Sequence, residues 1–441
     1  MTRPPKIVCF VPAKSRSERI ANKNTQVLDG DLLFRRKLRQ ALACEAIDAV
    51  YLDTEADAIA ELAGDLPVHH LRRPGGLASN ATDGHEMFAW ECAQVPDADL
   101  YIQALCTAPF VTAATLARAI GALLSEPEAD SLVAVTSARQ YCWNGAAPAY
   151  GRGRIPNSVD LDATVVEAMS LYIVRRRPGE APPTRRFGER PILFELDPVE
   201  QVDVNTPADL ALAETICAGQ RADDNSRLRA MKMHLSSPVL ADISKDFGFR
   251  AVLPRALRPT SPGKILGRAK TLSLVALDAD QRRTDAWKGI YAALDSYRFV
   301  RPGDVIMVAN GAPGRAYFGD LNANLAIRSG AQGAVIDGVT RDTADVRALG
   351  LPIYAHGSYC DDIKYEGTLA AMNRPIAIGD IPVANDDVVF ADEDGVVVVP
   401  EARWGAVADE AWRVMENEGR IRMMAARGRD VREILAECGA F

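Results

Sequence analysis

The sequence predicts an α/β protein of two domains, and three observations lead to this prediction. A chain of 441 residues exceeds what one hydrophobic core ordinarily holds. Strand-like and helix-like segments alternate through residues 6–138, which indicates a mostly parallel sheet covered by helices. A polar run, "GQRADDNSRLRA", then separates this half from a second half, in which several short strands are connected by short turns. We therefore predict domains at 1–220 and 233–441, joined by a linker at 221–232.

The elements of the first half follow from hydrophobic periodicity, taken in chain order. Apolar runs bounded by turn residues predict strands, and a period of 3.6 predicts helices. The predicted strands are 6–13, 47–54, 67–73, 99–110, 130–138 and a late strand starting at 199. The predicted helices are 32–46, 55–66, 83–95, 111–126 and a terminal helix ending near 219. Ligands of such folds bind beyond the carboxyl ends of strands, where the loop after Pro12 lies.

The sequence pattern of the second half predicts a compact α/β sandwich of short strands with flanking helices. Residues 236–248 start with serines and end in glycine, as helices often do. The other predicted helices are 285–297, 321–330 and the long, charged 401–428. The predicted strands are 264–277, 303–311, 331–342, 352–357, 374–380 and 387–400.

Charge and composition exclude several classes of protein. A net charge of −8 argues against binding nucleic acid or an anionic membrane surface, so the cations that gather locally indicate a small anionic ligand. No segment resembles a signal peptide or reaches the length of a membrane span. The eight cysteines are scattered without a CxxC pair, which is typical of reduced thiols. We therefore expect a cytoplasmic protein without nucleic-acid or membrane partners.

The stretch "VPAKSRSERIANKN", residues 11–24, gathers four cations at the end of the first predicted strand. They are Lys14, Arg16, Arg19 and Lys23. Backbone amides and cations at such a loop can hold phosphates, but the stretch contains neither GxxxxGK[ST] nor GxGxxG. From the residues alone, a solvated basic loop and a phosphate-binding loop both remain open.

The order of residues in this stretch resembles the opening loop of cytidylyltransferases that activate 2-keto sugar acids, typified by acylneuraminate and Kdo cytidylyltransferases. Further segments are similar in register over residues 1–220: "RRPGGLASNATDG", "QALCTAPF" and "VDVNTPADL". The resemblance implies a Rossmann-like nucleotidyltransferase domain that uses CTP and Mg²⁺.

The resemblance also implies roles for individual residues. Lys14 and Lys23 would hold the triphosphate, Ser15 and Asn24 would support the nucleotide, and Arg73 would contact the nucleotide or the acidic substrate. Lys23 and Asp203 would be catalytic, with Asp203 and Asn205 as metal ligands. The full set of implied nucleotide-binding residues is Pro12, Ala13, Lys14, Ser15, Arg19, Lys23, Asn24, Arg73 and Gln103.

Three positions depart from the family pattern. Arg16 stands where glycine is usual, Glu18 where lysine is usual, and Asn205 replaces the second aspartate of a D-x-D pair. An asparagine can ligate Mg²⁺ through its carbonyl oxygen but brings no charge. The departures imply a different substrate, a site built differently, or lost activity; the retained Lys14, Lys23, Asn24 and Asp203 favour the first.

A second motif spans residues 319–342, "GDLNANLAIRSGAQGAVIDGVTRD". An apolar strand ends in a glycine-rich turn and delivers the adjacent Arg341 and Asp342. Arginine can bind a carboxylate bidentately and aspartate can hold a divalent cation. A surface ion pair beyond a turn is the alternative.

Residues 235–400 resemble the RraA-like family, which includes class II 4-hydroxy-4-methyl-2-oxoglutarate aldolases and ribonuclease-inhibiting regulators. The segments "ILGRAKT", "RPGDVIMV" and "FADEDGVVVVP" share this resemblance. It implies an RraA-like α/β sandwich in which Arg341 orients a 2-keto acid and Asp342 anchors Mg²⁺ or Mn²⁺, both as catalytic residues. The substrate carboxylate would bind at Gly319, Asp320, Leu321 and Asn322. A homo-oligomer, trimeric or hexameric, is expected because RraA-like proteins commonly form trimers.

Together the two motifs predict a bifunctional enzyme. The first domain would transfer CMP from CTP to a 3-deoxy-2-keto sugar acid, and the second would be a metal-dependent aldolase acting on pyruvate-type substrates. In one alternative the second domain is a catalytically silent oligomerisation scaffold. In another the acceptor is a different anion, such as a phosphonate.

Overall fold

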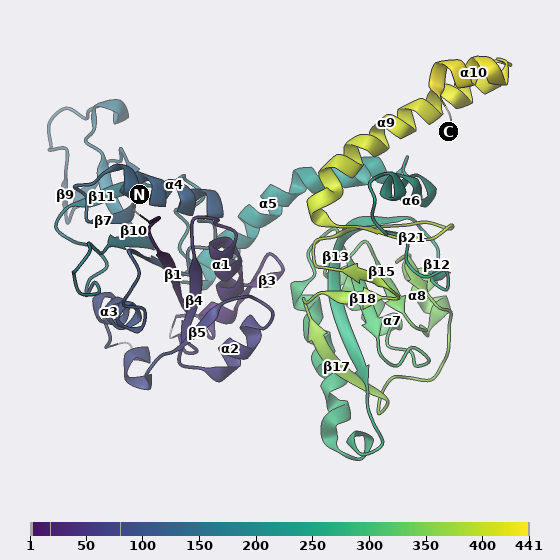
Figure 1. Ribbon diagram of the computed structural model, residues 1–441, viewed down its shortest axis with the longest axis horizontal. Helices are drawn as coiled ribbons and strands as arrows, with labels where there is room; N and C mark the ends of the chain where they lie inside the picture. Colours follow the sequence, from purple (N-terminus) through teal and green to yellow (C-terminus); the bar gives the residue numbers. More distant parts are fainter. Residues whose placement is uncertain (1–2, 18, 80, 440–441) are drawn as a thin grey trace. The chain divides into compact units, whose positions relative to one another are not determined.

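A computed structural model describes residues 3–17, 19–79 and 81–439, and its chain divides into two compact units between Ala218 and Gly219. The ribbon is coloured along the sequence in Figure 1. Helix α5 (Pro207–Lys232) crosses the division, so the residues predicted as a linker are helical. The two units, unit 1 and unit 2, are described separately below.

Unit 1 is built on a seven-stranded sheet in the order β11-β7-β10-β6-β1-β4-β5. Strand β1 pairs in parallel with β4 and β6, and β10 pairs antiparallel with β6 and β7. The sheet is therefore mostly parallel, as predicted. Its strands are β1 (Ile7–Pro12), β4 (Ala49–Thr54), β5 (His69–Arg72), β6 (Leu100–Ala104), β7 (Ser131–Ala138), β10 (Thr164–Arg175) and β11 (Pro191–Glu195).

Helices pack on this sheet through apolar faces. Helix α1 (Leu33–Leu42) buries Leu33, Phe34, Leu38 and Ala41. Helix α3 (Gly84–Gln94) starts with a capping box, in which Asp83 accepts from the amides of His85 and Glu86. The other helices are α2 (Asp57–Ala63), α4 (Ala113–Ser125) and the 3-10 turns η1 (Lys23–Thr25), η2 (Gly75–Ala78) and η3 (Ser158–Asp160). Two-residue ladders join β2 (Val27–Leu28) to β3 (Asp31–Leu32) and β8 (Trp143–Asn144) to β9 (Ala147–Pro148).

The predicted strand starting at 199 is wrong. Residues 199–206 form turns and loop before α5. The amides of Glu200 and Val202 donate to the carbonyls of Asp197 at 2.9 Å and Val199 at 3.4 Å, so these donors close turns instead of joining a sheet. Strands β10 and β11, in contrast, have no counterpart in the sequence prediction.

Unit 2 is built on a mixed eight-stranded sheet in the order β12-β16-β15-β14-β13-β20-β21, with β17 also paired to β13. Strands β13, β14, β15 and β16 run parallel. The strands are β12 (Arg258–Ser261), β13 (Ile265–Ala276), β14 (Asp304–Asn310), β15 (Gly333–Asp337), β16 (Ile353–Ala355), β17 (Gly367–Met372), β20 (Val388–Ala391) and β21 (Val396–Val399). A separate hairpin joins β18 (Ile376–Ile378) to β19 (Ile381–Val383).

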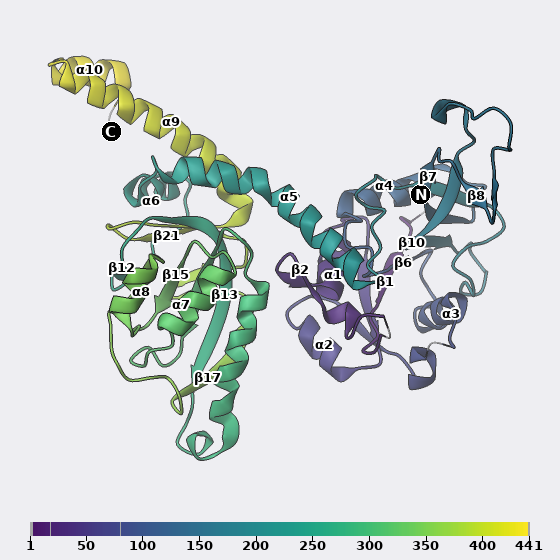
Figure 2. The same ribbon diagram turned by 180° about the vertical axis from the view of Figure 1, so that it is seen from behind.

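Three α-helices of unit 2 lie close to their predicted positions: α6 (Ser237–Asp246), α7 (Asp320–Arg328) and α9 (Glu401–Ala426). Helices α8 (Thr343–Leu349) and α10 (Val431–Cys438) were not predicted, and η4 (Gln281–Arg283) and η5 (Asp285–Phe299) are of the 3-10 type. Figure 2 shows α9 extending past the sheet of this unit, with α10 at its far end.

The helix predicted at 285–297 is a 3-10 helix, η5. The Ala286 carbonyl accepts a hydrogen bond from Thr368 Oγ1 of β17 at 3.1 Å. This bond ties the first turn of η5 to β17.

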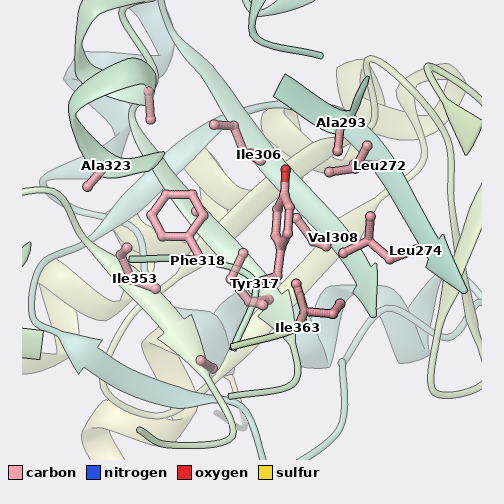
Figure 3. Packing of buried hydrophobic residues seen from close by; sticks show 14 of the residues in the cluster. Leu272, Leu274, Ala293, Ile306, Val308, Tyr317, Phe318, Ala323, Ile353 and Ile363 are labelled. Atoms are coloured by element: carbon pink, nitrogen blue, oxygen red, sulfur yellow. The ribbon is translucent and has the colours of Figure 1, made fainter. Parts of the chain in front are cut away.

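The core beside α7 and η5 is formed by side chains of several strands packed around Tyr317 and Phe318 (Figure 3). Leu272 and Leu274 come from β13, and Ile306 and Val308 from β14. This cluster makes the chain before Gly319 rigid, because its side chains are almost fully excluded from water. Within the described residues, no helix is both long and apolar enough to cross a membrane.

Candidate functional sites

The loop after β1 is anchored to β4 and to itself. The Ala13 amide donates to the Asp53 carbonyl at 2.8 Å, and Ser15 donates through its amide and hydroxyl to Glu55 Oε1, each at 2.7 Å. Asn24 Nδ2 donates to the Lys14 carbonyl at 2.8 Å, which closes the loop. Parallel pairing of β1 with β4 and β6 places this loop at the carboxyl edge of the sheet.

A cavity of about 490 Å³ opens beside this loop. Five cationic and two acidic side chains line it, an excess of positive charge in an acidic protein. The lining includes eight residues predicted from the sequence: Pro12, Lys14, Arg19, Lys23, Asn24, Arg73, Asp203 and Asn205. They extend from Pro12 to Asn205, so the sheet edge brings the first loop and the chain before α5 together.

Lys23, Asn205 and Asp203 form one hydrogen-bonded chain in this cavity. Lys23 Nζ donates to Asn205 Oδ1 at 3.1 Å, and Asn205 Nδ2 donates to Asp203 Oδ2. Burial lowers the pKa of Lys23, and the charge of Asp203 opposes that shift. The other carboxylate oxygen, Asp203 Oδ1, is buried and has no hydrogen-bond partner in the described chain. The unpaired Asp203 oxygen fits a divalent cation, whereas the Asn205 amide oxygen already accepts from Lys23 and its nitrogen faces Asp203.

Arg73 lines the cavity but is held by Asp53. Its Nε and Nη2 donate to the Asp53 carboxylate at 2.6 to 3.0 Å, and Nη2 also reaches the Asp53 carbonyl at 3.1 Å. Both side chains are almost completely buried. The charge of Arg73 is therefore largely neutralised within the protein before any ligand binds.

Three predicted nucleotide-binding residues, Ala13, Ser15 and Gln103, lie outside the cavity lining. Ala13 and Ser15 make the loop contacts given above. Gln103, fully buried in β6, donates to Glu91, whose pKa is raised by burial and by the nearby Asp53 charge. Glu18 lies outside the described residues.

The cavity also contains residues that the motif did not indicate. Cys106 donates its thiol to Asn24 Oδ1 at 3.1 Å, and burial raises its pKa to about 11, so it packs as a neutral thiol. Met169 lies on β10 and Arg186 on the segment between β10 and β11. Both were missed because β10 and β11 were not predicted, and no spacing in "PTRRFGER" distinguishes Arg186 from its neighbours.

A second cavity, of about 680 Å³, lies in unit 2. Its wall combines apolar side chains of η5 with the polar ends of two loops, among them Leu294, Tyr317 and Arg341. The lining contains all six residues predicted for this half: Gly319, Asp320, Leu321, Asn322, Arg341 and Asp342. Asp362 and Lys364 complete its charged rim and were not predicted.

Gly319 and Asp342 approach each other so closely that no side chain fits at position 319. A Cβ there would lie 2.3 Å from Asp342 Oδ2. The Asp320 amide, 3.4 Å from the same oxygen, donates to it. Asp342 itself has a left-handed backbone with φ of 53°, a conformation that costs energy and that functional sites tolerate. The carboxylate is thus fixed against the amino end of α7.

Arg341 is paired with two aspartates at the cavity rim. Its Nη1 lies 2.6 Å from Asp362 Oδ2, and its Nε lies 3.4 Å from Asp342 Oδ2. All three side chains are about one-third exposed. The Arg341 amide donates to the Phe318 carbonyl at 3.0 Å, which ties this residue to the rigid core.

A divalent cation at the second cavity would have few protein ligands. Among residues 3–17, 19–79 and 81–439, no group of three or more His, Cys, Asp or Glu side chains is placed to hold a metal. Asp342 and Asp320 both face the cavity. One or two carboxylates, with water completing the shell, is an arrangement that Mg²⁺ accepts, so the donor set fits a weakly held cation.

Comparisons with known proteins separate the same two halves. Residues 8–155 match a family model described as cytidylyltransferase, and residues 237–398 match one described as aldolase/RraA. The resemblances stated from the sequence are thereby confirmed for both halves.

Two curated relatives match part of the chain. Protein DlpA of Legionella pneumophila is 26% identical over 174 residues, which are 39% of this chain and 28% of that protein. A protein of Halalkalibacterium halodurans, with the provisional name 4-hydroxy-4-methyl-2-oxoglutarate aldolase, is 32% identical over 34% of this chain and 65% of its own length. The chain thus spans less than two thirds of either relative.

Solved structures resemble each half. Streptomyces coelicolor RraAS2 is 29% identical, with a TM-score of 0.39, over 45% of this chain and 96% of its own. A CMP:2-keto-3-deoxy-manno-octonic acid synthetase complexed with CTP is 14% identical, with a TM-score of 0.36, over 49% of this chain and 99% of its own.

Proposed function

From a chain that carries a cytidylyltransferase domain and an RraA-like aldolase domain, we propose a bifunctional enzyme acting on 3-deoxy-2-keto sugar acids. Unit 1 transfers CMP from CTP to the sugar acid. Unit 2 makes or cleaves the sugar acid at a pyruvate-derived carbon–carbon bond. The two activities are chemically linked, because many such sugar acids are formally aldol adducts of pyruvate.

The observation that carries the first activity is the cation-rich cavity at the carboxyl edge of the unit 1 sheet. Lys14, Arg19 and Lys23 supply positive charge from one loop, as a triphosphate requires. The anomeric hydroxyl of the acid gives its proton to water and its oxygen bonds to the α-phosphorus. The bond from that phosphorus to the bridging oxygen breaks, and pyrophosphate leaves with the electron pair of that bond. Lys23, kept in place by Asn205, offsets the charge that develops on the phosphate oxygens.

Asp203 and Asn205 are the residues that would hold Mg²⁺ in this site. When bound, the cation neutralises phosphate charge and aligns the leaving group. The orphaned Asp203 Oδ1 supports this assignment, and the neutral Asn205 implies weaker binding than a pair of aspartates would give.

Pyrophosphate release tests the first activity. The purified chain is incubated with CTP, Mg²⁺ and a panel of 3-deoxy-2-keto sugar acids and aminoalkyl phosphonates, and pyrophosphate is measured. We expect release with at least one sugar acid. Release with phosphonates alone would select the alternative acceptor class, and no release at all would refute the transferase proposal.

The observation that carries the second activity is the fixed Gly319–Asp342 contact beside Arg341. The amide donors at the start of α7 and the Arg341 guanidinium suit a 2-keto acid. Asp342, with Asp320, would hold Mg²⁺ or Mn²⁺; when bound, the cation polarises the keto oxygen and favours the enolate of pyruvate. Arg341 orients the carboxylate, and the apolar wall of η5 excludes water from the rest of the substrate.

Pyruvate release from candidate aldol adducts tests this second activity. The double variant Arg341→Ala/Asp342→Ala should lose it and keep the oligomeric state of the parent chain. If the parent chain releases no pyruvate from any adduct while remaining a trimer or hexamer, unit 2 is a silent scaffold, which is the second candidate function.

A further inference from the structure

Arg186 is a buried arginine on the wall of the unit 1 cavity. It lies between β10 and β11 and is only 8% exposed. Its guanidinium carbon lies 4.8 Å from the centre of the Tyr172 ring, a cation–π contact. A Cβ on Gly84 would lie 2.3 Å from Arg186 Nη1, so the start of α3 leaves room for this guanidinium only because residue 84 is glycine.

No acidic side chain forms an ion pair with Arg186 within the part of the chain that the structure describes. Its Nε is buried without a hydrogen-bond partner, and the guanidinium takes part in no ion pair there. Asp83, which lines the same cavity, forms no ion pair with Arg186 and accepts from the amides of His85 and Glu86 through Oδ1 as the cap of α3. Arg73, the other buried arginine of the cavity, is paired with Asp53. Arg186 is therefore the buried cation whose charge is left for a ligand.

The Tyr172 ring, which packs against Arg186, contacts a residue with a strained backbone, Met169. Tyr172 donates its hydroxyl hydrogen to the Glu167 carboxylate, and the same hydroxyl oxygen lies 3.1 Å from Met169 Sδ. Met169 has a φ of 48°, at the bulge where the pairing of β10 with β7 shifts between Glu167 and Tyr172. A non-glycine residue in this left-handed region persists only where the surrounding structure enforces it, typically at functional sites. Met169 lies on the same cavity wall as Arg186.

We propose that Arg186, Tyr172 and Met169 form the acceptor subsite of unit 1, in which Arg186 binds the acceptor's carboxylate and Met169 limits the acceptor's size. This proposal rests on the transfer reaction proposed above. The cations of the loop after β1 are occupied by the triphosphate, whereas Arg186 comes from another segment and lacks an internal counterion. Arginine binds a planar carboxylate through two parallel hydrogen bonds, and Tyr172 holds its guanidinium in one plane for this.

Steady-state kinetics of Arg186→Gln test the carboxylate assignment. We expect KM for the sugar acid to rise about 10- to 100-fold, as for loss of a charged hydrogen bond, and KM for CTP to stay within about twofold. Arg185→Gln, an exposed neighbour, is the matched control and should change neither. Arg186→Lys should recover part of the loss. Circular dichroism and CTP binding show whether Arg186→Gln is folded.

The outcomes separate this inference from the transfer reaction itself. If the parent chain transfers CMP and Arg186→Gln leaves KM for the acid unchanged, or raises KM for CTP equally, the subsite is refuted while the transferase proposal stands. If the variant is impaired only with phosphonate acceptors, the carboxylate assignment is refuted. If the parent chain transfers CMP to no acceptor, the proposed function fails first.

Met169→Gly tests the size limit. Glycine relieves the left-handed strain and removes the side chain from the wall, so kcat/KM for longer sugar acids should rise relative to shorter ones. The melting temperature should stay the same or rise. An unchanged order of acceptors in a variant that still transfers CMP would refute the role of Met169.

Discussion

The cavities of unit 1 and unit 2 both place arginines beside aspartates, but they bury these charges to different extents. In unit 1 the Arg73 and Asp53 side chains are 2% and 0% exposed, whereas in unit 2 the Arg341 and Asp362 side chains are 36% and 37% exposed. The distance between the arginine nitrogen and the aspartate oxygen is 2.6 Å in both pairs. The contact distance therefore does not distinguish the two pairs. Their different exposure to solvent decides how much each contributes to the free energy of unfolding.

The balance of charge also differs between the cavities. Five cationic and two acidic side chains line the first, and two cationic and three acidic side chains line the second. A surplus of cations suits a polyanion such as a triphosphate, whereas a mixed rim over an apolar wall suits a small acid and a divalent cation. The following predictions test this contrast, from the largest expected effect to the smallest.

The buried ion pair should dominate the stability of unit 1. Asp53→Asn leaves the Arg73 charge buried and unpaired and should lower the free energy of unfolding by about 3–5 kcal/mol. Asp362→Asn, the matched change in unit 2, should cost less than about 1 kcal/mol because its partner is partly solvated. Urea unfolding followed by circular dichroism measures both. Equal losses in the two variants would contradict the contrast in burial.

Lys23 should be needed for one activity only. Lys23→Ala removes a cation held toward the phosphates by Asn205 and should lower the rate of pyrophosphate release about 10²- to 10³-fold. Pyruvate release by the same variant should be unchanged, and Arg341→Ala should show the reverse pattern. A loss of both activities in either single variant would mean that the two cavities do not work independently.

Gly319→Ala should damage the second cavity through geometry alone. The new Cβ would lie 2.3 Å from Asp342 Oδ2 and would displace the carboxylate, for which a loss of about 10²-fold in pyruvate release is expected. Gly314→Ala is the control, because nothing lies within 4 Å of a Cβ at that position. Full activity of Gly319→Ala would show that the close contact has no role in positioning Asp342.

A buried lysine should give unit 1 a pH dependence. Burial lowers the pKa of Lys37 from its ordinary 10.5 to about 7, and its Nζ donates to the Val111 carbonyl. Between these two values the unfolded chain binds a proton that the folded chain lacks, so stability should rise with pH by at most about 1.4 kcal/mol per unit. Lys37→Met should flatten this slope and stabilise unit 1 at pH 7. An identical pH profile for the variant and the parent chain would contradict the assignment.

Much of the candidate sites could be predicted because motif residues are close in sequence. Lys14, Lys23 and Asn24 lie on one loop, and Arg341 and Asp342 are adjacent, so local chemistry indicates each group. The strand predicted at 199 failed because the amides of Glu200 and Val202 close turns on the carbonyls of Asp197 and Val199, which hydrophobic periodicity does not detect.

What the sequence determined by itself is the division into two α/β halves, their family resemblances and the local motifs, because periodicity and residue order are properties of neighbouring residues. Only the tertiary structure decided which charges remain available to a ligand. Arg73 and Arg186 are both arginines near the same cavity, yet Asp53 neutralises the first and no acid in the described chain pairs with the second. The partners of a buried charge come from strands distant in sequence, and their distances set its energy.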